Sequence, residues 1–541
     1  MGDLFSVVRV LGDGPFAHIG RPSVVATSSD GEYTAIGGDL GRAQWPGHDV
    51  QSRSRPSCGW IPIGIYRTSD LSCIHVATTH WPVNSIAFHP TLPLVAIGTG
   101  SYDGGYFYEG ELLLLDLDSG RLVSVMRQRR QVKHVVWSDA RTMDLVLAPP
   151  SDEHIDALGV LALAVTVAHD DWSNPQPSMI HLEGLPEVVL DGTFQVDYEA
   201  AQAAVERLGA AQGRSWRLRR KVWAVRSTAD RRVLAALEGV ALECWPPDAL
   251  EPDWTVPTDG VGCQIAVHPD GQTAISNLHR EDRSRASLVL DVLLADGSST
   301  VHTNANCPMV LVTRADGWSA LRDADYNRRK HHTTTLLSPD RSTVVTADLG
   351  VYDLINHYFD IRNAPDLLFL QGAKDKPWLG KWVVALDPPT DTQELVIRRL
   401  FPLEWDEQRG AHLFGGPGIY LEDQAGTGII HAGAVHDGSG LLPGNSFVVR
   451  RAYPSGQLQW AFTADYKATA IDAAQNTVYV AYNSGELVAL DAQTGVVLGR
   501  QQITVTGHKV VPLSLTLTGP GRLVIGTLDG RLLDCALPTP D

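Results

Sequence analysis

The sequence has few cysteines, and their spacing does not suggest a metal site. Six cysteines are scattered over 541 residues, and no Cys-x-x-Cys pair occurs. Structural zinc sites and redox dithiols use closely spaced cysteine pairs. The pattern therefore predicts no metal and no cofactor, and it favours reduced thiols in a reducing compartment.

Long apolar runs and an excess of positive charge are also missing. No apolar run approaches the roughly 18 residues that span a bilayer, and the first residues lack the basic and apolar segments of a secretory signal. The chain carries 62 acidic and 44 basic residues, a net charge of −18. A nucleic-acid-binding surface has to attract phosphate. We therefore expect a cytoplasmic protein that binds no membrane, and the charge argues against nucleic acid.

Familiar catalytic motifs are absent as well. Neither His-Glu-x-x-His nor Gly-x-Ser-x-Gly occurs, and the glycine-rich segment FGGPGIYLEDQAGTG (414–428) lacks the Lys-Ser/Thr of a phosphate-binding loop. His89 and His268 each precede a proline at the same place in a repeated motif, so we interpret both as turn formers. The sequence predicts no catalytic residue, and we expect that the protein is not an enzyme.

What the sequence does contain is a repeated pattern of short β-rich runs separated by glycine turns. The clearest copy, Ala468 to Gly495, reads as three strands and two turns. Related copies include VNSIAFHPTLPLVAIGTG (83–100), ELLLLDLDSGRLVSVM (111–126) and VGCQIAVHPDGQTAISN (261–277). Such runs predict antiparallel strands, and repeating units of roughly 40 to 60 residues are typical of β-propeller blades.

Two groups of motifs resemble known propeller families. HPDG, SPDR and SDGEY resemble the inner-strand turns of WD40 repeats, and ALDAQTGVVLGR, LDLDSGRLV and YPSGQLQWAF resemble quinoprotein (PQQ-like) repeats. The resemblance covers nearly the whole chain. It implies an all-β fold, a single closed β-propeller over residues 1–541 with about eight four-stranded blades, within a range of roughly seven to nine. A β-sandwich or a set of separate all-β domains is the alternative.

The ends of the chain and three insertions complete the predicted ring. Leu4–Val10 reads as a strand without a blade of its own, whereas the last blade has only three strands, so we expect residues 4–10 to supply its fourth strand. Insertions are expected as a loop over 42–62, a helical segment over 191–217 with a helix at Val196–Gly209, and an irregular segment over 306–332. Within the last, Met309–Thr313 reads as a strand and Ser319–Arg328 as a short helix.

The pattern favours a non-catalytic protein–protein interaction scaffold, a subunit of a larger intracellular complex that binds one or more proteins. Exposed aromatic and basic residues on insertions are the candidate partner-binding groups. They are Tyr102, Tyr106, Phe107, Tyr108, Trp45, Trp60, Trp216, Arg219, Arg220, Arg328, Arg329 and Lys330. Two alternatives remain open: the aromatic loop Tyr102–Glu109 folds back onto its blade, and Arg214–Lys221 is a solvated strand edge.

The resemblance also implies a second function, a quinoprotein-like enzyme or a small-ligand binder that uses the central channel. The sequence departs from the quinoprotein family because it has no export signal, no adjacent cysteine pair and only Trp460 at the regular tryptophan position of the repeat. Scaffold and channel binder are distinguished by whether the purified protein carries a chromophore.

The predicted closing strand can be tested by truncation. Deleting residues 1–12 leaves the last blade with an open edge, so we expect a sharply lower melting temperature than for the full chain. An unchanged thermal unfolding curve would contradict the assignment.

Overall fold

The computed structural model describes residues 3–42, 59–103, 105–158, 161–192, 194–280, 287–305, 309–323, 333–348, 359–372, 380–389, 394–405, 411–437, 440–474 and 476–538. The fold is all-β, with 57% strand and 5% helix, and many of its sheets are four-stranded and antiparallel. In these ranges no closed barrel or ring of hydrogen-bonded strands is detected, and no helix combines the length and apolarity needed to cross a bilayer.

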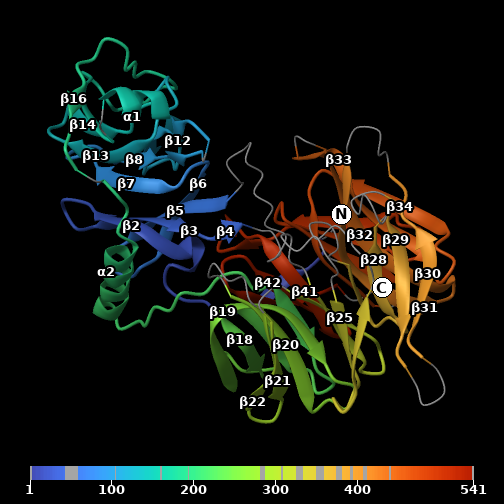
Figure 1. Ribbon diagram of the computed structural model, residues 1–541. Helices are drawn as coiled ribbons and strands as arrows, with labels where there is room; N and C mark the ends of the chain where they lie inside the picture. Colours follow the sequence, from blue (N-terminus) through green and yellow to red (C-terminus); the bar gives the residue numbers. More distant parts are fainter. Residues whose placement is uncertain are drawn as a thin grey trace. The chain divides into compact units, whose positions relative to one another are not determined.

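The described residues form two compact units (Figure 1). Unit 1 contains residues 3–13 and 219–538, and unit 2 contains residues 14–42 and 59–218, each with the gaps given above. A single ring through the whole chain is therefore not what the contacts show. The chain starts in unit 1, passes through unit 2 and returns to unit 1.

Unit 2 contains three main sheets, in the orders β2-β3-β5 with β4 and β6 on β5, β12-β11-β8-β7 and β13-β14-β15-β16, and the small pair β9-β10. Its elements are η1 (Ala17–Ile19), β2 (Arg21–Thr27), β3 (Tyr33–Asp39), β4 (Gly41–Arg42), β5 (Gly59–Arg67), β6 (Cys73–Thr79), β7 (Val83–Phe88), β8 (Leu94–Thr99), β9 (Ser101–Tyr102), β10 (Tyr108–Glu109), β11 (Leu112–Asp116), β12 (Leu122–Ser124), β13 (Val132–Trp137), β14 (Thr142–Leu147), α1 (Asp152–Leu158), β15 (Leu163–Ala168), β16 (Val188–Val189) and α2 (Tyr198–Ala211).

Unit 1 contains the sheets β17-β18-β19-β20-β21-β22, β23-β24-β25-β26, β28-β29-β30, β27-β31-β32-β33-β34, β35-β36-β37-β38 and β1-β43-β42-β41, with the pair β39-β40. Its strands are β1 (Ser6–Leu11), β17 (Ala224–Ser227), β18 (Val233–Trp245), β19 (Trp254–Val267), β20 (Thr273–His279), β21 (Ser287–Leu293), β22 (Ser299–Ala305), β23 (Met309–Thr313), β24 (Ser319–Asp323), β25 (Thr333–Leu337), β26 (Val344–Asp348), β27 (Asp360–Arg362), β28 (Leu367–Gln371), β29 (Trp382–Asp387), β30 (Val396–Pro402), β31 (His412–Asp423), β32 (Gly426–Asp437), β33 (Gly440–Ala452), β34 (Leu458–Ala464), β35 (Ala468–Ala474), β36 (Thr477–Tyr482), β37 (Glu486–Asp491), β38 (Val497–Gln502), β39 (Thr504–Val505), β40 (His508–Lys509), β41 (Pro512–Gly519), β42 (Arg522–Thr527) and β43 (Leu532–Ala536).

The first strand of the chain completes the last sheet. β1 pairs antiparallel with β43, with Ser6 opposite Ala536 and Leu11 opposite Leu532. The Nη2 atom of Arg9 lies 2.6 Å from the Oδ2 atom of Asp534. The side chain of Gln501, on β38 of the neighbouring sheet, accepts hydrogen bonds from the Leu4 and Phe5 amides and donates one to the Phe5 carbonyl. The amino-terminal segment thus connects the last two sheets.

Apolar side chains form layers between consecutive sheets of unit 1. One layer contains Phe5, Leu487 and Leu533 and joins the sheet of β35–β38 to the sheet of β1 and β41–β43. A second contains Leu11, Val225 and Leu532 and joins the latter sheet to β17 and β18. Further layers join β20 and β21 to β23–β25, β28–β29 to β31–β32, and β32–β33 to β36–β37. No sheet could bury its faces alone, so the sheets stabilise one another.

The chain leaves unit 1 and returns to it at neighbouring points. Gly12, with φ +66°, directly follows β1, and a Cβ atom on it would lie 2.7 Å from Nε of Arg219. Arg219 is where the chain re-enters unit 1. Unit 2 is therefore inserted between the first strand of unit 1 and the rest of that unit.

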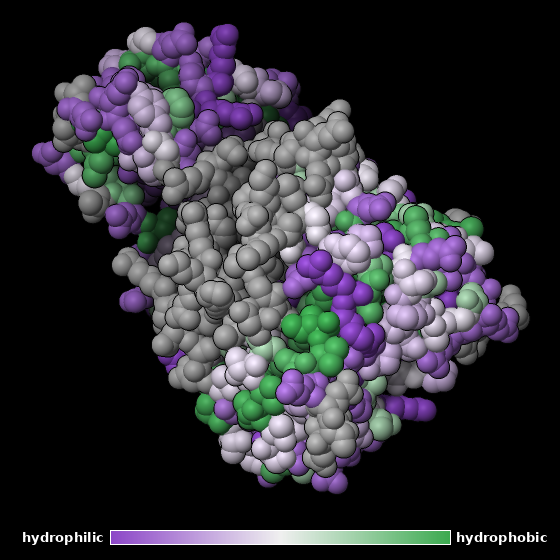
Figure 2. All heavy atoms as spheres, turned by 45° about the vertical axis from the view of Figure 1, so that its right-hand side comes forward, coloured by the Kyte–Doolittle hydropathy of each residue, from purple (hydrophilic) through white to green (hydrophobic). Residues whose placement is uncertain are grey.

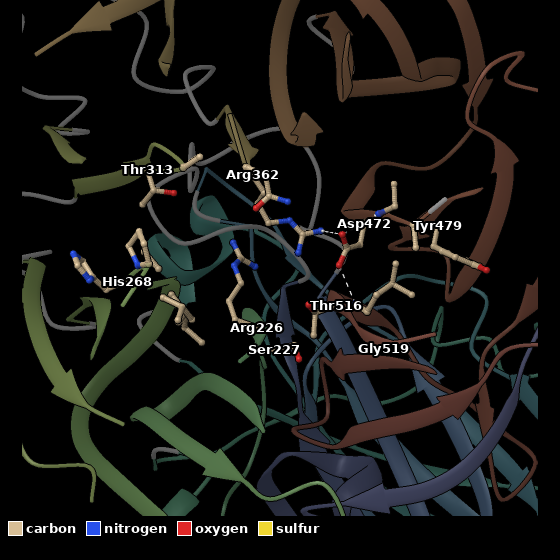
Figure 3. Close-up of a pocket in the computed structure, with 18 of the residues that line it drawn as sticks. Arg226, Ser227, His268, Thr313, Arg362, Asp472, Tyr479, Thr516 and Gly519 are labelled. Atoms are coloured by element: carbon tan, nitrogen blue, oxygen red, sulfur yellow. Dashed lines mark hydrogen bonds and ion pairs between the residues drawn. The ribbon is translucent and has the colours of Figure 1, made fainter. Parts of the chain in front are cut away.

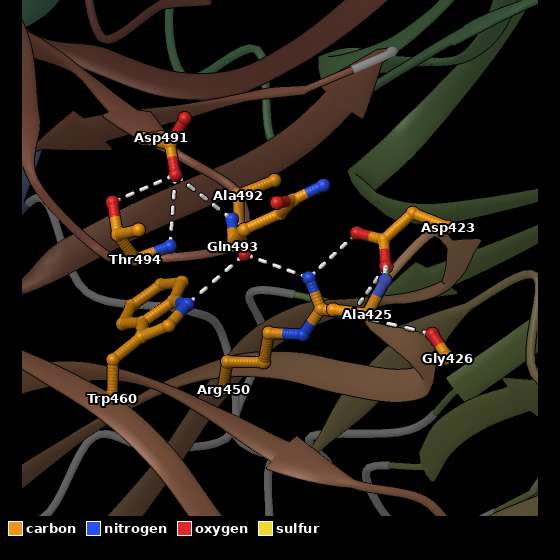
Figure 4. A network of polar contacts seen from close by, with 9 residues as sticks. All are labelled: Asp423, Ala425, Gly426, Arg450, Trp460, Asp491, Ala492, Gln493 and Thr494. Carbon is orange, nitrogen blue, oxygen red and sulfur yellow. Dashed lines mark hydrogen bonds and ion pairs between the residues drawn. The ribbon is translucent and has the colours of Figure 1, made fainter.

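A buried arginine holds two sheets together through polar contacts (Figure 4). Arg450, on β33, is fully buried and donates to both carboxylate oxygens of Asp423, at 2.6 and 2.7 Å, and to the Ala492 carbonyl at 2.8 Å. The indole of Trp460 donates to the same carbonyl at 2.9 Å. Asp491 accepts from the amides of Gln493 and Thr494, which shapes the turn that presents this carbonyl.

Several local predictions can be compared with the structure. The helix expected at Val196–Gly209 is confirmed as α2, which lies beside β2 (Figure 1) and buries Val205 against Ile19, Ile36 and Tyr66. The strand over Leu4–Val10 is confirmed as β1. The strand expected at Met309–Thr313 is confirmed as β23, whereas the helix expected over Ser319–Arg328 is wrong where the structure describes it, because residues 319–323 form β24.

The reason for that error is burial. Residues 309–313 and 319–323 form the strands β23 and β24, because Leu311 and Leu321 belong to a buried layer that a helix over 319–328 would break up. In the same way, the loop predicted over 42–62 ends earlier than expected, since β5 begins at Gly59, whereas 43–58 lies outside the described residues.

The packing of the amino-terminal segment against the last two sheets is tested by two substitutions, one at position 5 and one at position 8. Phe5 is 3% exposed and Val8, on β1, is 50% exposed. We expect Phe5→Ala to lower the free energy of unfolding by about 3 kcal/mol or more and Val8→Ala by about 0.5 kcal/mol or less, measured by urea unfolding. Similar losses in both variants would contradict the packing of the amino-terminal segment.

The Arg450–Asp423 contact predicts a pH-dependent stability. Hydrogen bonds from Arg450 hold the pKa of Asp423 below 3.8. A carboxylate with a lowered folded-state pKa stabilises the fold above its unfolded pKa, and this contribution is lost as the pH falls through the folded pKa. We expect Asp423→Asn to cost about 3 kcal/mol at pH 6, because it leaves a buried guanidinium without its counter-charge.

The difference from the wild type should shrink as the pH falls below about 4. The control is Glu486→Gln, whose partner Arg500 is half exposed, and it should cost about 1 kcal/mol or less. A loss for Asp423→Asn that is equally large at every pH would count against the assignment.

Candidate functional site

A cavity of about 790 Å³ lies within unit 1, where the ends of several strands meet. Its walls come from β17, β19, β23, β27, β35 and β41, which belong to five different sheets. Figure 3 shows Arg226 and Arg362 in the middle of the view, with Asp472 on one side and His268 and Thr313 on the other. Among the described residues, the ionisable groups of the lining are four arginines, one histidine, one aspartate and Tyr479.

Arg362 is fixed by backbone and carboxylate acceptors from the neighbouring sheets. Its guanidinium donates to the carbonyls of Ile471 and Leu515 and lies 3.2 Å from the Oδ1 atom of Asp472. Asp472 in turn accepts from the Ala473 and Leu517 amides, each at 2.9 Å. These bonds connect β27, β35 and β41 around the cavity wall.

Arg226 lies near a second carboxylate deeper in unit 1. Its Nη2 atom is 3.5 Å from the Oδ2 atom of Asp360, which lines a much smaller cavity of about 30 Å³ together with Arg226 and Arg362. Burial raises the pKa of Asp360, and the charges of Arg226 and Arg362 partly oppose this rise. Arginine stays protonated in proteins, so these side chains are suited to donating hydrogen bonds and not to proton transfer.

The other two arginines of the lining come from turns. Arg314 follows β23. Its Nε and Nη2 atoms donate hydrogen bonds to the carboxylate of Asp316, at 2.7 Å and 2.5 Å. Arg341 lies in the turn between β25 and β26. Its Nε atom donates a hydrogen bond to Asp291 at 3.4 Å, and its Nη1 atom donates one to the Ser338 carbonyl at 2.9 Å. Arg314 and Arg341 line the cavity, whereas their partners Asp316 and Asp291 do not.

The turn role expected for His89 and His268 is confirmed. The Nδ1 atom of His89 accepts from the amides of Thr91 and Leu92, and that of His268 accepts from the amide of Asp270. His268 nevertheless also lines the cavity, which its position in a repeated turn does not reveal.

The predicted aromatic loop lies in unit 2 and is partly fixed and partly exposed. Asp103 accepts from the amides of Gly105, Tyr106 and Phe107, and β9 pairs with β10 so that Tyr102 lies opposite Tyr108. Their rings are 4.8 Å apart. Tyr102 is 41% exposed and Phe107 50% exposed, so the loop both contacts its own unit and presents aromatic surface.

A hydrogen bond at this loop changes the acidity of a tyrosine. The hydroxyl of Tyr102 donates to Asp152, at the start of α1, over 2.7 Å. This bond to a carboxylate is the main cause that raises the pKa of Tyr102 to about 12. Tyr106 and Phe107 also contact each other at 4.7 Å, edge to face.

The basic candidates of the segment Arg214–Lys221 do not form a solvated strand edge as a group. Arg219 donates to both oxygens of the buried Glu243, at 3.0 and 2.8 Å. Arg220 is 7% exposed and pairs with Glu238. That interpretation is wrong for these two residues because they form ion pairs with carboxylates of β18, the buried Glu243 and the partly buried Glu238. Trp216 packs against the layer that contains Val205 of α2.

The remaining candidates are Trp60, Trp45, Arg328, Arg329 and Lys330. Trp60 lies in β5, where Gly41 is its partner on β4. The other four lie outside the described residues. No cluster of three or more potential metal ligands was found among the described residues.

Comparison with known proteins places the chain in no family. No protein-family model matches the sequence, and no curated protein is significantly similar to it.

Proposed function

We propose that the protein is a non-catalytic protein–protein interaction scaffold, a subunit of a larger intracellular complex, and that its unit 1 is a closed β-propeller. The ring is then smaller than the whole chain, and unit 2 is an insertion that carries a binding loop. The arguments are the order of the sheets in unit 1 and the fixed geometry of the aromatic loop in unit 2.

The proposed ring rests on which strands are neighbours. β41 packs beside β35 on one side and beside β17 on the other. β35 packs beside β31, β31 pairs with β27, β27 contacts β23, and β23 contacts β20, which shares a sheet with β17. The succession thus returns to its starting sheet. A cavity lined by these same strands is expected at the centre of such an arrangement.

The aromatic loop is the observation that carries the scaffold role. Exposed aromatic residues dominate binding energy at protein interfaces, and a fixed loop loses little conformational entropy when a partner binds. Asp103, the β9–β10 pair and the bond from Tyr102 to Asp152 fix this loop while Tyr102 and Phe107 remain exposed. On the coloured part of the face in Figure 2, hydrophobic residues occur in small separate areas among hydrophilic ones, as is normal for protein surfaces.

The cysteines support an intracellular location. Cys73, Cys244, Cys263 and Cys535 form no disulfide, and three of them are buried within strands where a reducing compartment leaves thiols unchanged.

The cavity of unit 1 supports a second candidate function, the binding of a small molecule. Cavities of roughly 300–1,000 Å³ are typical of small-molecule sites, and the volume of about 790 Å³ lies in that range. Side chains fixed by neighbouring strands line it, so the site is formed before any ligand arrives.

Capture of partners by the immobilised protein tests the scaffold role. We expect the wild type to retain one or more proteins from a lysate of its native host and Phe107→Ala to retain them with roughly tenfold lower affinity or worse, as for a central interface aromatic. The matched control is Val136→Ala, which removes an exposed apolar side chain of β13 in the same unit.

Equal capture by Phe107→Ala and the wild type would contradict the role of the loop. A wild-type protein that retains no partner but carries a chromophore or a bound molecule, seen by absorbance and mass spectrometry, would favour the second candidate function instead.

A further inference from the structure

The lining of the cavity in unit 1 is strongly biased toward positive groups. Arg226, Arg314, Arg341 and Arg362 line it, and Asp472 is the one carboxylate among its lining residues in the part of the chain that is described. The protein as a whole has a net charge of −18. The arginine-rich lining of this cavity therefore contrasts with the negative net charge of the whole protein.

Three of the four carboxylates that pair with these arginines do not belong to the lining of the cavity. Asp316, Asp291 and Asp360 are partners of Arg314, Arg341 and Arg226, and none of the three lines the cavity. These three arginines thus belong to the lining, whereas the carboxylates that hold them in place do not.

Two of these arginines still have donor groups to offer. A guanidinium has five N–H donors. Arg314 uses Nε and Nη2 on Asp316, and Arg341 uses Nε on Asp291 and Nη1 on Ser338. In the described residues the Nη1 group of Arg314 and the Nη2 group of Arg341 have no hydrogen-bond acceptor. Neither group is among the buried atoms without a partner, so both reach solvent and can donate to a ligand that replaces water there.

We infer that this cavity binds a small anionic molecule that carries carboxylate or phosphate groups. Guanidinium forks match the planar geometry of both groups and form short, charge-assisted hydrogen bonds with them. Because four arginines contribute to the lining, the cavity suits a molecule with more than one anionic group. Fixed arginines bind such a ligand without reorganisation, because Asp316, Asp291 and Asp472 already hold their positions. The inference deepens the second proposed function and does not depend on the aromatic loop.

Titration calorimetry on the full chain tests the inference with two anionic probes, citrate for carboxylates and inorganic pyrophosphate for phosphates. We expect at least one probe to bind, with an affinity that falls as salt is added. Arg314→Gln and Arg341→Gln should each weaken that binding about tenfold or more, since each removes charge-assisted hydrogen bonds. Which probe binds more tightly identifies the anionic group.

The matched control is Arg232→Gln. Arg232 pairs with Asp230 two residues away, just as Arg314 pairs with Asp316, but it does not line the cavity. It should bind the probes like the wild type. Equal affinities in all four proteins, or no binding of either probe at millimolar concentration by folded protein, would overturn the inference, whereas loss of partner capture by Phe107→Ala would leave it unaffected.

Discussion

Unit 1 depends on the pairing of the first strand of the chain with the last. A β-sheet with an unpaired edge exposes backbone donors and acceptors and invites wrong pairing. β1 removes this edge from β43, and Phe5 and Leu11 on either side of it enter two different apolar layers. These two layers are complete only when the ends of the sequence are brought together, so burial on both faces offsets the cost of closing a very long loop.

The position of the inserted unit is compatible with the pairing of β1 and β43. Gly12 and Arg219 lie in contact where the chain leaves and re-enters unit 1, so an insertion at this point leaves the β1–β43 pair intact. Arg219 is itself neutralised by the buried Glu243, and Arg531 pairs with Asp529 nearby in the sequence of the last sheet. Ion pairs at this point thus hold the chain where it re-enters unit 1.

The sequence predicts individual strands and helices well because their periodicity is a local signal. Leu4–Val10 and Val196–Gly209 are recognisable from periodicity and composition alone, and both elements are present. The helix expected at Ser319–Arg328 is wrong over residues 319–323, because burial between neighbouring strands favours the strand β24 there. The cavity was not predictable as a set of residues: Arg362 meets Asp472 and Leu515 through the arrangement of sheets, and nothing in the local sequence of either residue indicates this contact.

The central claim is that β1 is an integral strand of the last sheet and closes the proposed ring. Hydrogen–deuterium exchange of the native protein measures it directly, because amide protection reports the free energy of local opening. The account predicts that the amides of residues 6–11 that donate to β43 are protected to the same extent as the paired amides of β42 and β43, although β1 is the outermost strand of its sheet. Rapid exchange of every amide in residues 6–11, while β42 and β43 remain protected, would contradict it.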